Sequence, residues 1–167
     1  MKIFLSFLMA LTFLQAYEGD LSPQEAYEMQ KEGKAIIVDV RTTLEFLYTG
    51  HGEGFINIPA YYWTYDPKSI ETRMQSADYE LKNAKTKDHI SMMKLYDAKE
   101  LVNKNFVKEV MQAMKISGVE NVILVCRSGP RSSAAAEILS KEGIKAYNLE
   151  DGFINGWIKE ELPWGGQ

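Results

Sequence analysis

The sequence predicts an α/β fold in which helices cover both faces of a central, mostly parallel β-sheet. Two short apolar runs rich in β-branched residues, at 35–38 and 121–125, have the length and composition of strands that are buried on both faces. A third strand is expected at 145–149. Segments with apolar residues at helical spacing alternate with these strands, and this alternation is typical of an α/β protein with a parallel sheet.

The helices follow in order along the chain. The first is expected to begin at Ser22, because Ser22 is a suitable cap, Pro23 suits the first helical position and Glu25 completes a capping box. Its end is expected near Gly33. The remaining elements are helices at 43–48, 68–82, 104–116 and 131–142, a short strand at 56–58, and a turn with a short helix at 152–157.

The segment 60–104 has the least regular pattern of the chain. It opens with a cluster of aromatic residues, Tyr61, Tyr62, Trp63 and Tyr65. The helix predicted at 68–82 rests on apolar residues at helical spacing, Ile70, Met74, Ala77 and Leu81. We expect the aromatic cluster to pack beneath this helix, and the alternative is that it lines the mouth of a pocket or a partner surface. Residues 83–89 are expected to form a loop.

The first 16 residues have the pattern of a secretory signal peptide. Lys2 supplies a positive charge, residues 3–14 form a short apolar run, and Ala16 is a small residue at which cleavage is expected. The apolar run is short for a membrane span, and an uncleaved anchor is the alternative. We therefore expect an exported protein of the periplasm whose mature part, residues 17–167, is a single domain.

The composition argues against some classes of function. A net charge of −4, with no block of basic residues, argues against nucleic-acid binding. The chain has two histidines, His51 and His89, and no visible cluster of His, Cys and carboxylate side chains, so we expect neither a metal nor another cofactor. We expect a structural role for His51, which lies in a Gly-rich turn, and a surface position for His89.

The strongest functional signal surrounds Cys126, the single cysteine of the chain. By count alone such a residue is a buried apolar side chain, a partner for another chain, or a reactive thiol. Here it ends a predicted buried strand and opens a short loop that leads into a helix, namely Cys126, Arg127, Ser128, Gly129, Pro130, Arg131 and Ser132. Parallel sheets bind ligands at this end of their strands, and N–H groups at the start of the following helix stabilise a thiolate. We therefore expect a curled loop that holds an accessible thiolate in an anion cradle, to which Arg127 and Arg131 add positive charge.

This loop resembles the active-site loop of the rhodanese family. A second, upstream stretch is similar to the other signature of that family and comprises Asp39-Val40-Arg41, Glu45, Gly50-His51, Gly54 and the run 56–59. The two signatures cover about 36–59 and 121–164 and follow one another in the family's order. The resemblance implies a rhodanese-like fold in which the segment 60–104 is longer than the minimal connection of the family.

The resemblance also implies a sulfurtransferase reaction. Cys126 would take sulfane sulfur from a small anion, either thiosulfate or polysulfide, and carry it as a persulfide held by the loop N–H groups from Arg127 to Ser132. A thiophilic acceptor, for instance a small thiol or a protein, would then remove the sulfur. Asp39 and Arg41 match a structural pair at the pocket edge of the family, and a surface ion pair is the alternative reading of these two residues.

Other functions stay open beside this one. The domain could carry a persulfide without turnover, or bind a protein partner through the segment 60–104. A Cys-dependent phosphatase is a further alternative, but such enzymes need an Arg six positions after the Cys, whereas Arg131 lies five positions after Cys126 and position 132 is Ser. The shorter loop suits a single sulfur atom better than a phosphate group. A homodimer is also compatible with the sequence.

Overall fold

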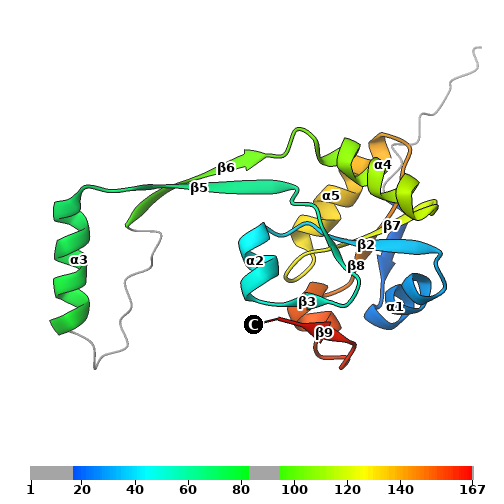
Figure 1. Cartoon of the computed structure of the whole chain (residues 1–167), viewed down its shortest axis with the longest axis horizontal. Helices are drawn as coiled ribbons and strands as arrows, with labels where there is room; N and C mark the ends of the chain where they lie inside the picture. Colours follow the sequence, from blue (N-terminus) through cyan, green and yellow to red (C-terminus); the bar gives the residue numbers. More distant parts are fainter. Residues whose placement is uncertain (1–16, 83–94, 167) are drawn as a thin grey trace, which may run out of the picture.

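Five parallel strands form the central sheet of the protein (Figure 1). The computed structural model describes residues 17–82 and 95–166, so the expected signal peptide, the loop expected at 83–89 and His89 lie outside the described residues. In spatial order the strands are β1 (Gly19–Leu21), β8 (Lys145–Leu149), β7 (Asn121–Val125), β2 (Ala35–Asp39) and β4 (Ile56–Asn57), and every neighbouring pair is parallel. The predicted parallel sheet is confirmed. Only β1 was not predicted, because three residues are too few to show a periodicity.

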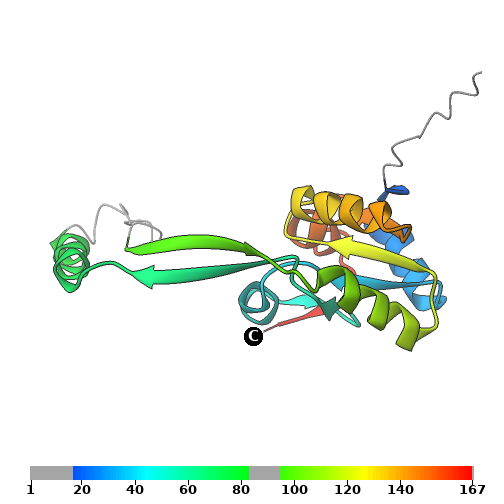
Figure 2. The same ribbon diagram turned by 90° about the horizontal axis from the view of Figure 1, so that it is seen from above.

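Helices cover both faces of the sheet, as predicted (Figure 2). On one face lie α1 (Pro23–Lys31) and the π-helical segment η2 (Gly152–Trp157), and on the other α4 (Phe106–Ser117) and α5 (Pro130–Lys141). Successive residues of β2 point to opposite faces, so Ile37 belongs to the same apolar cluster as Trp157, and Val38 to the same cluster as Val110 and Leu139. This explains why 35–38 is apolar throughout: both faces of the strand are core.

Two capping boxes begin the helices on the N-terminal side of the chain. In α1 the Ser22 hydroxyl accepts a hydrogen bond from the Glu25 N–H, and the Glu25 carboxylate accepts one from the Ser22 N–H at 3.0 Å, as predicted. The same arrangement of Thr42 and Glu45 begins α2 (Thr43–Tyr48), where it was not predicted. The second box places the Glu45 carboxylate at the start of α2, close to the carboxyl end of the sheet.

The segment between β4 and α4 forms an arm that extends away from the rest of the protein (Figures 1 and 2). Its strands β5 (Tyr61–Pro67) and β6 (Tyr96–Val102) pair in an antiparallel ribbon, and α3 (Ile70–Lys82) lies at the far end of that ribbon. We call the described part of residues 61–102 the arm. The helix predicted at 68–82 is confirmed, whereas β5 and β6 were missed, because neither run is apolar enough to resemble a buried strand.

The expected packing of the aromatic cluster beneath the 68–82 helix is wrong. Because β5 is fully extended, it carries α3 away from the cluster, and Trp63 pairs with Glu100 of β6 instead. Two residues of the apolar stripe of α3 face solvent: the exposed fraction is 54% for Ile70 and 65% for Met74. The arm therefore leaves large apolar side chains exposed rather than adding them to the core.

A small sheet closes the C-terminal end of the described chain. It pairs β3 (His51–Gly52) with β9 (Trp164–Gly165) in antiparallel fashion. His51 stacks on Phe46 with ring centroids 3.8 Å apart, and its Nδ1 lies 3.2 Å from the Phe46 carbonyl oxygen, which is the structural environment expected for it. Among the residues that the structure describes, no helix is both long and apolar enough to cross a bilayer.

The turn after β8 is hydrogen-bonded to the loop that follows β7. The chain turns at Gly152, whose φ is 64°, and the first N–H groups of η2 then point at the loop. The Phe153 N–H donates to the Cys126 carbonyl at 2.8 Å, and the Ile154 N–H to the Arg127 carbonyl at 3.1 Å. A Cβ at position 152 would lie 2.7 Å from the Cys126 carbonyl oxygen and 2.6 Å from the Ser128 nitrogen, so only glycine permits this approach.

Gly152→Ala is therefore expected to lower the free energy of unfolding by roughly 1–3 kcal/mol more than Gly143→Ala does. Both glycines have a positive φ, 64° and 76°, so both variants force an alanine into the left-handed region and lose stability for that reason. The two sites differ in space, because among the described residues no atom lies within 4 Å of a Cβ at Gly143. Urea unfolding followed by circular dichroism measures both losses. Equal losses of unfolding free energy in the two variants would contradict the close packing of the loop against η2.

Candidate active site

The residues from Cys126 to Ser132 form a tight loop between β7 and α5. Cys126 follows the last residue of β7, and Pro130 is the first residue of α5. The loop curls because Gly129 adopts φ 104°, which brings its N–H to 3.2 Å from the Cys126 Sγ. The predicted curl at the carboxyl end of a buried strand is therefore present, and the N-terminus of α5 faces the sulfur.

The thiol itself is buried, which contradicts the expected accessibility. Cys126 is 1% exposed and belongs to the apolar cluster between β7 and α5. The reason is the tightness of the curl, since the loop backbone at Gly129 covers the sulfur that it hydrogen-bonds. The sulfur thus lies beneath backbone N–H groups of the loop, with almost none of the residue exposed to solvent.

Hydrogen bonds from the loop outweigh the effect of burial on the thiol. Burial raises the pKa of Cys126, because a charged sulfur is poorly solvated there. Opposing it are donors that stabilise the thiolate: the Ser132 hydroxyl and the N–H groups of Ser128, Ser132 and Gly129. The net result is a pKa below the ordinary value of a cysteine. Three of the loop residues predicted to hold the sulfur therefore contribute donors to it.

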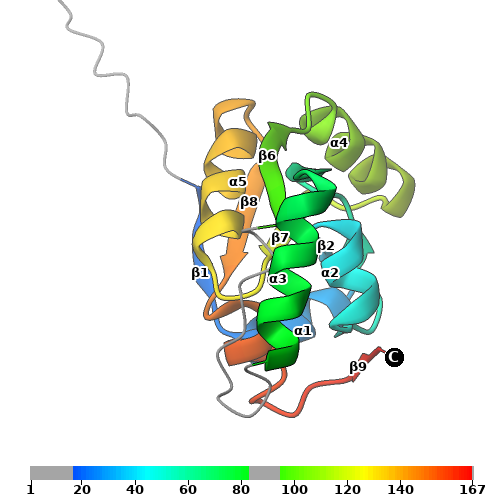
Figure 3. The same ribbon diagram turned by 90° about the vertical axis from the view of Figure 1, so that its left-hand side faces the viewer.

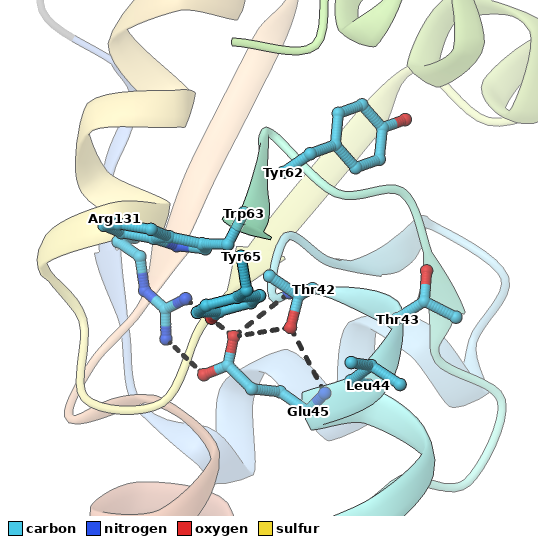
Figure 4. Close-up of a pocket in the computed structure, with 8 residues that line it drawn as sticks. All are labelled: Thr42, Thr43, Leu44, Glu45, Tyr62, Trp63, Tyr65 and Arg131. Atoms are coloured by element: carbon cyan, nitrogen blue, oxygen red, sulfur yellow. Dashed lines mark hydrogen bonds and ion pairs between the residues drawn. The ribbon is translucent and has the colours of Figure 1, made fainter. Parts of the chain in front are cut away.

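Arg131 is bound to α2 and is not free to bind an anion. Its guanidinium donates to both carboxylate oxygens of Glu45, at 2.9 Å and 2.7 Å (Figure 4). This hydrogen-bonded contact with Glu45 raises the pKa of Arg131. The expected positive charge on the loop is thus largely neutralised at Arg131, whereas Arg127 is exposed at the surface. The bidentate pair instead ties the loop to the capping box that begins α2.

The Glu45 carboxylate is strongly held in its ionised form. Burial raises its pKa, but the hydrogen bonds and charge of Arg131 and the hydrogen bonds from Thr42 lower the pKa to about 2. Thr42 donates to the same carboxylate through its N–H and its hydroxyl, both at 3.1 Å. The sequence named Glu45 within the upstream signature but did not predict this role, although the Thr-x-x-Glu spacing at 42–45 was a usable signal.

Asp39 and Arg41 form a buried ion pair. Arg41 Nη2 lies 2.6 Å from Asp39 Oδ2, and the exposed fractions of the two side chains are 1% and 0%. Arg41 also donates to the Gly50 carbonyl at 2.7 Å and to the Thr49 hydroxyl at 2.8 Å, and its guanidinium lies 4.6 Å from the centroid of the Phe153 ring. The alternative of a surface ion pair is therefore wrong. The pair connects the end of β2 to the turn at 49–50 and to Phe153 of η2, and it does not line the pocket described next.

A pocket of about 450 Å³ opens beside the loop, between α2 and the base of the arm. Its lining comes from three segments and consists of Thr42, Thr43, Leu44, Glu45, Tyr62, Trp63, Tyr65 and Arg131. Figure 4 shows the Trp63 and Tyr65 side chains directed toward the Arg131–Glu45 pair. Three residues of the aromatic cluster, Tyr62, Trp63 and Tyr65, thus line a pocket, which was the less favoured of the two sequence-based alternatives, whereas Tyr61 packs against the core. Within the described residues, no three His, Cys, Asp or Glu side chains gather so as to hold a metal ion.

The Glu45–Arg131 pair makes a pH-dependent contribution to stability. A carboxyl whose pKa falls from 4.5 to about 2 on folding stabilises the protein above pH 4.5, and this contribution is lost as the pH falls toward 2. We expect Glu45→Gln to lower the free energy of unfolding by about 1 kcal/mol at pH 7, because the pair is about one-third exposed and solvent screens it. The deficit should shrink below pH 4.5 and be absent near pH 2.

Urea unfolding of both proteins at a series of pH values measures this difference. Glu32→Gln is the matched control, since Glu32 pairs with Lys34 at the surface and its side chain is 56% exposed, and we expect little loss there at any pH. A deficit of Glu45→Gln that does not change between pH 7 and pH 2 would contradict the ionic origin of the contribution.

Comparisons with known proteins identify the family to which this domain is similar. The rhodanese-like domain model matches residues 22–160. Rhodanese-like domain-containing protein 17 of Arabidopsis thaliana is 28% identical over 128 residues, which cover 75% of this chain and 60% of that protein. The chain thus spans about 60% of the length of this curated relative.

Solved structures share the fold. Rv0390 from M. tuberculosis superimposes with a TM-score of 0.58 at 24% identity, covering 91% of this chain and 100% of that one. The thiosulfate sulfurtransferase of Pseudomonas aeruginosa gives a TM-score of 0.52 at 16% identity over 89% of this chain and 20% of that one. Likeness at these identities concerns the fold, but the family model covers most of the chain. The chain therefore belongs to the rhodanese-like domain family.

Proposed function

We propose that the protein is a sulfurtransferase that moves sulfane sulfur from thiosulfate or polysulfide to a thiophilic acceptor through a persulfide on Cys126. The fold is one that supports sulfurtransferase-type enzymes. The observation that carries the proposal is a thiol with a lowered pKa at the centre of a loop whose N–H groups point at one sulfur atom. Such a site favours a thiolate nucleophile at Cys126, and the persulfide anion that it forms carries its charge on the added outer sulfur.

The proposed reaction has two displacement steps. The Cys126 thiolate attacks the outer sulfur of thiosulfate, the S–S bond of thiosulfate breaks, and sulfite leaves with the electron pair. With polysulfide, the leaving group is a polysulfide one sulfur shorter. A thiolate or cyanide acceptor then attacks the outer sulfur of the persulfide, and the Cys126 thiolate leaves. No net redox change occurs at Cys126, so the cycle needs no redox cofactor.

The loop is proposed to stabilise both sulfur anions. The N–H groups of Ser128, Gly129 and Ser132 are placed to stabilise negative charge on Sγ, and Pro130 contributes none because it lacks an N–H. Since Cys126 is 1% exposed, loosening of the loop precedes attack in this scheme. Of the two arginines in the described loop, Arg131 is paired with Glu45, and Arg127, which is exposed next to Cys126, is proposed to attract the donor anion.

The geometry gives a phosphatase less support. Arg131 lies five positions after Cys126, so the loop between them is one residue shorter than a phosphate cradle needs. Both oxygens of Glu45 accept hydrogen bonds from Nη1 and Nη2 of Arg131, so these two groups are already engaged and do not form a bidentate site for a phosphate. An aryl phosphate assay is therefore expected to show no turnover that depends on Cys126.

A second candidate function is that of a persulfide carrier that delivers sulfur to one protein only. The arm favours it, because apolar side chains on the arm face solvent beside the site: the exposed fraction is 42% for Tyr62, 48% for Tyr65 and 50% for Leu101. In this case small acceptors would not discharge the persulfide, although the donor would still load it.

Incubation of the protein with thiosulfate or polysulfide is expected to add the mass of one sulfur atom. The loop donors stabilise the persulfide anion enough for it to survive rapid desalting and mass spectrometry under native conditions. Cys126→Ser is the control and should gain nothing. Absence of the gain with both donors, or a gain that survives Cys126→Ser, would sink the proposal.

The loaded protein also separates the two candidates. Discharge by cyanide or a small thiol, with release of the added sulfur over repeated cycles, is expected for a sulfurtransferase. Loading without discharge by small acceptors would favour the carrier.

We further propose that the protein is exported to the periplasm and that residues 1–16 are removed. The support is the sequence pattern of Lys2, the apolar run 3–14 and Ala16. Fractionation of cells is expected to place the chain in the periplasm with Tyr17 as its first residue, and Leu8→Arg, which interrupts the apolar run, should retain it in the cytoplasm. A membrane-bound chain that still begins at Met1 would instead show an anchor.

A further inference from the structure

A line of hydrogen bonds connects the cysteine loop to the first strand of the sheet. The Ser132 hydroxyl lies 2.7 Å from Asn148 Oδ1 in β8, and Asn148 Nδ2 donates to Asp20 Oδ1 in β1 at 2.8 Å. The parallel register of these strands pairs Asp20 with Asn148, which is why the two side chains meet. Ser132 and Asn148 are buried, with exposed fractions of 0% and 5%, so water does not compete easily for their hydrogen bonds.

Asp20 determines which way the Asn148 amide points. A carboxylate accepts hydrogen bonds and donates none, and the Tyr17 hydroxyl also donates to Asp20 Oδ1, at 2.9 Å. The amide of Asn148 must therefore present its NH₂ group to Asp20. Its oxygen consequently faces Ser132, and it can only accept a hydrogen bond from that hydroxyl.

The Ser132 hydroxyl has one proton and several acceptors around it. Besides Asn148 Oδ1, the Gly129 carbonyl oxygen lies 2.8 Å away, and the Cys126 sulfur accepts from the same hydroxyl when it is ionised. A hydroxyl donates one hydrogen bond at a time. A proton held by Asn148 is therefore not available to the thiolate, and a proton given to the thiolate leaves a buried amide oxygen without its donor.

We propose that Asn148, oriented by Asp20, is a positioning residue that holds the Ser132 hydroxyl proton away from Cys126 and thereby restrains formation of the reactive thiolate. The importance of this restraint for sulfur transfer rests on the proposed function, but the restraint itself is a property of the thiol. Ionisation of Cys126 turns the Ser132 proton toward sulfur, at the expense of the hydrogen bond to Asn148.

The other charged groups around the loop stay the same when the Ser132 hydroxyl turns from Asn148 to Cys126. Among the described residues they are the Arg131–Glu45 pair from α5 and α2, the buried Asp39–Arg41 pair, the exposed Arg127, Asp20 at the end of the line of hydrogen bonds, and Glu150 and Asp151 after β8. Substitution of Asn148 by Leu, which has a similar volume and no acceptor, changes none of these charges. Any change in the ionisation of Cys126 then reports on the hydrogen bond to Ser132.

The test measures the rate at which iodoacetamide alkylates Cys126 as a function of pH in the full chain. Because Cys126 is the single cysteine, the reaction takes place at one thiol. The shape of the pH profile gives its thiolate fraction, whereas loosening of the loop over the buried sulfur scales the rate as a whole. In Asn148→Leu the pKa of Cys126 is expected to fall by about half a unit to one unit, since ionisation no longer strands a buried acceptor. In Ser132→Ala the pKa is expected to rise, because the thiolate loses its hydroxyl donor.

The double variant Asn148→Leu/Ser132→Ala discriminates positioning from general loosening of the loop. If Asn148 acts through Ser132, the double variant has the pKa of Ser132→Ala, and the effect of Asn148→Leu is abolished. If Asn148 merely supports the loop, its loss should raise the pKa in either background. A rise or no change in Asn148→Leu, or a fall that persists in the double variant, overturns the proposal.

Asp20→Asn gives a second test at an exposed position, which matters if Asn148→Leu does not fold. An amide at position 20 can accept as well as donate, so Asn148 is free to turn its NH₂ group toward Ser132, and the pKa should fall as in Asn148→Leu but by less. Glu18→Gln removes a nearby exposed charge outside this line of hydrogen bonds and serves as the control for charge alone. Equal shifts in Asp20→Asn and Glu18→Gln would contradict the proposal.

This measurement stands apart from the test of the proposed function, because alkylation needs no sulfur donor. A protein that fails to gain sulfur can still show the predicted pattern of pKa values. A protein that loads sulfur can equally lack it. The two proposals can therefore fail independently.

Discussion

The structure of the site depends on the contact between the loop at 126–132 and the start of η2. Two backbone hydrogen bonds from η2, to the carbonyl oxygens of Cys126 and Arg127, hold the loop from below, and Gly152 permits the approach because it has no side chain. With these carbonyl groups held, the loop N–H groups are free to turn inward to the sulfur. One turn after β8 thus determines the geometry around a thiol that is more than 20 positions earlier in the chain.

The electrostatics of the site come from backbone dipoles and hydroxyl groups more than from formal charges. The sequence predicted three arginines near the site, and two of them have carboxylate partners. Arg41 pairs with Asp39, and Arg131 pairs with Glu45. These pairs connect elements rather than attract substrate, since their charges cancel locally. What remains beside the sulfur, in the part of the chain that the structure describes, is a set of short-range donors. Ser132 contributes a hydroxyl to this set, and the other donors are backbone N–H groups.

In this member of the family, the arm forms one side of the pocket beside the site. Its ribbon leaves the body next to the loop, and its aromatic side chains face the Arg131–Glu45 pair across a pocket of about 450 Å³. Seen from the end of the arm, α3 lies in front of the sheet and the loop region (Figure 3). A two-stranded ribbon with exposed apolar side chains buries little surface of its own, so it contributes shape to the site more than stability to the fold.

The sequence by itself determined the parallel sheet, the helices on both faces and the curled cysteine loop. These follow from local patterns: apolar runs such as 121–125, the capping signals at Ser22, and Gly129-Pro130 before a helix. Only the tertiary structure decided which groups meet. It buried Cys126 and the Asp39–Arg41 pair, bound Arg131 to Glu45, carried α3 away from the aromatic cluster, and brought Asp20 and Asn148 to Ser132. The physical reason is that burial and pairing depend on elements far apart in the chain, whereas helix starts, strand periodicity and turns are encoded within a few neighbouring residues.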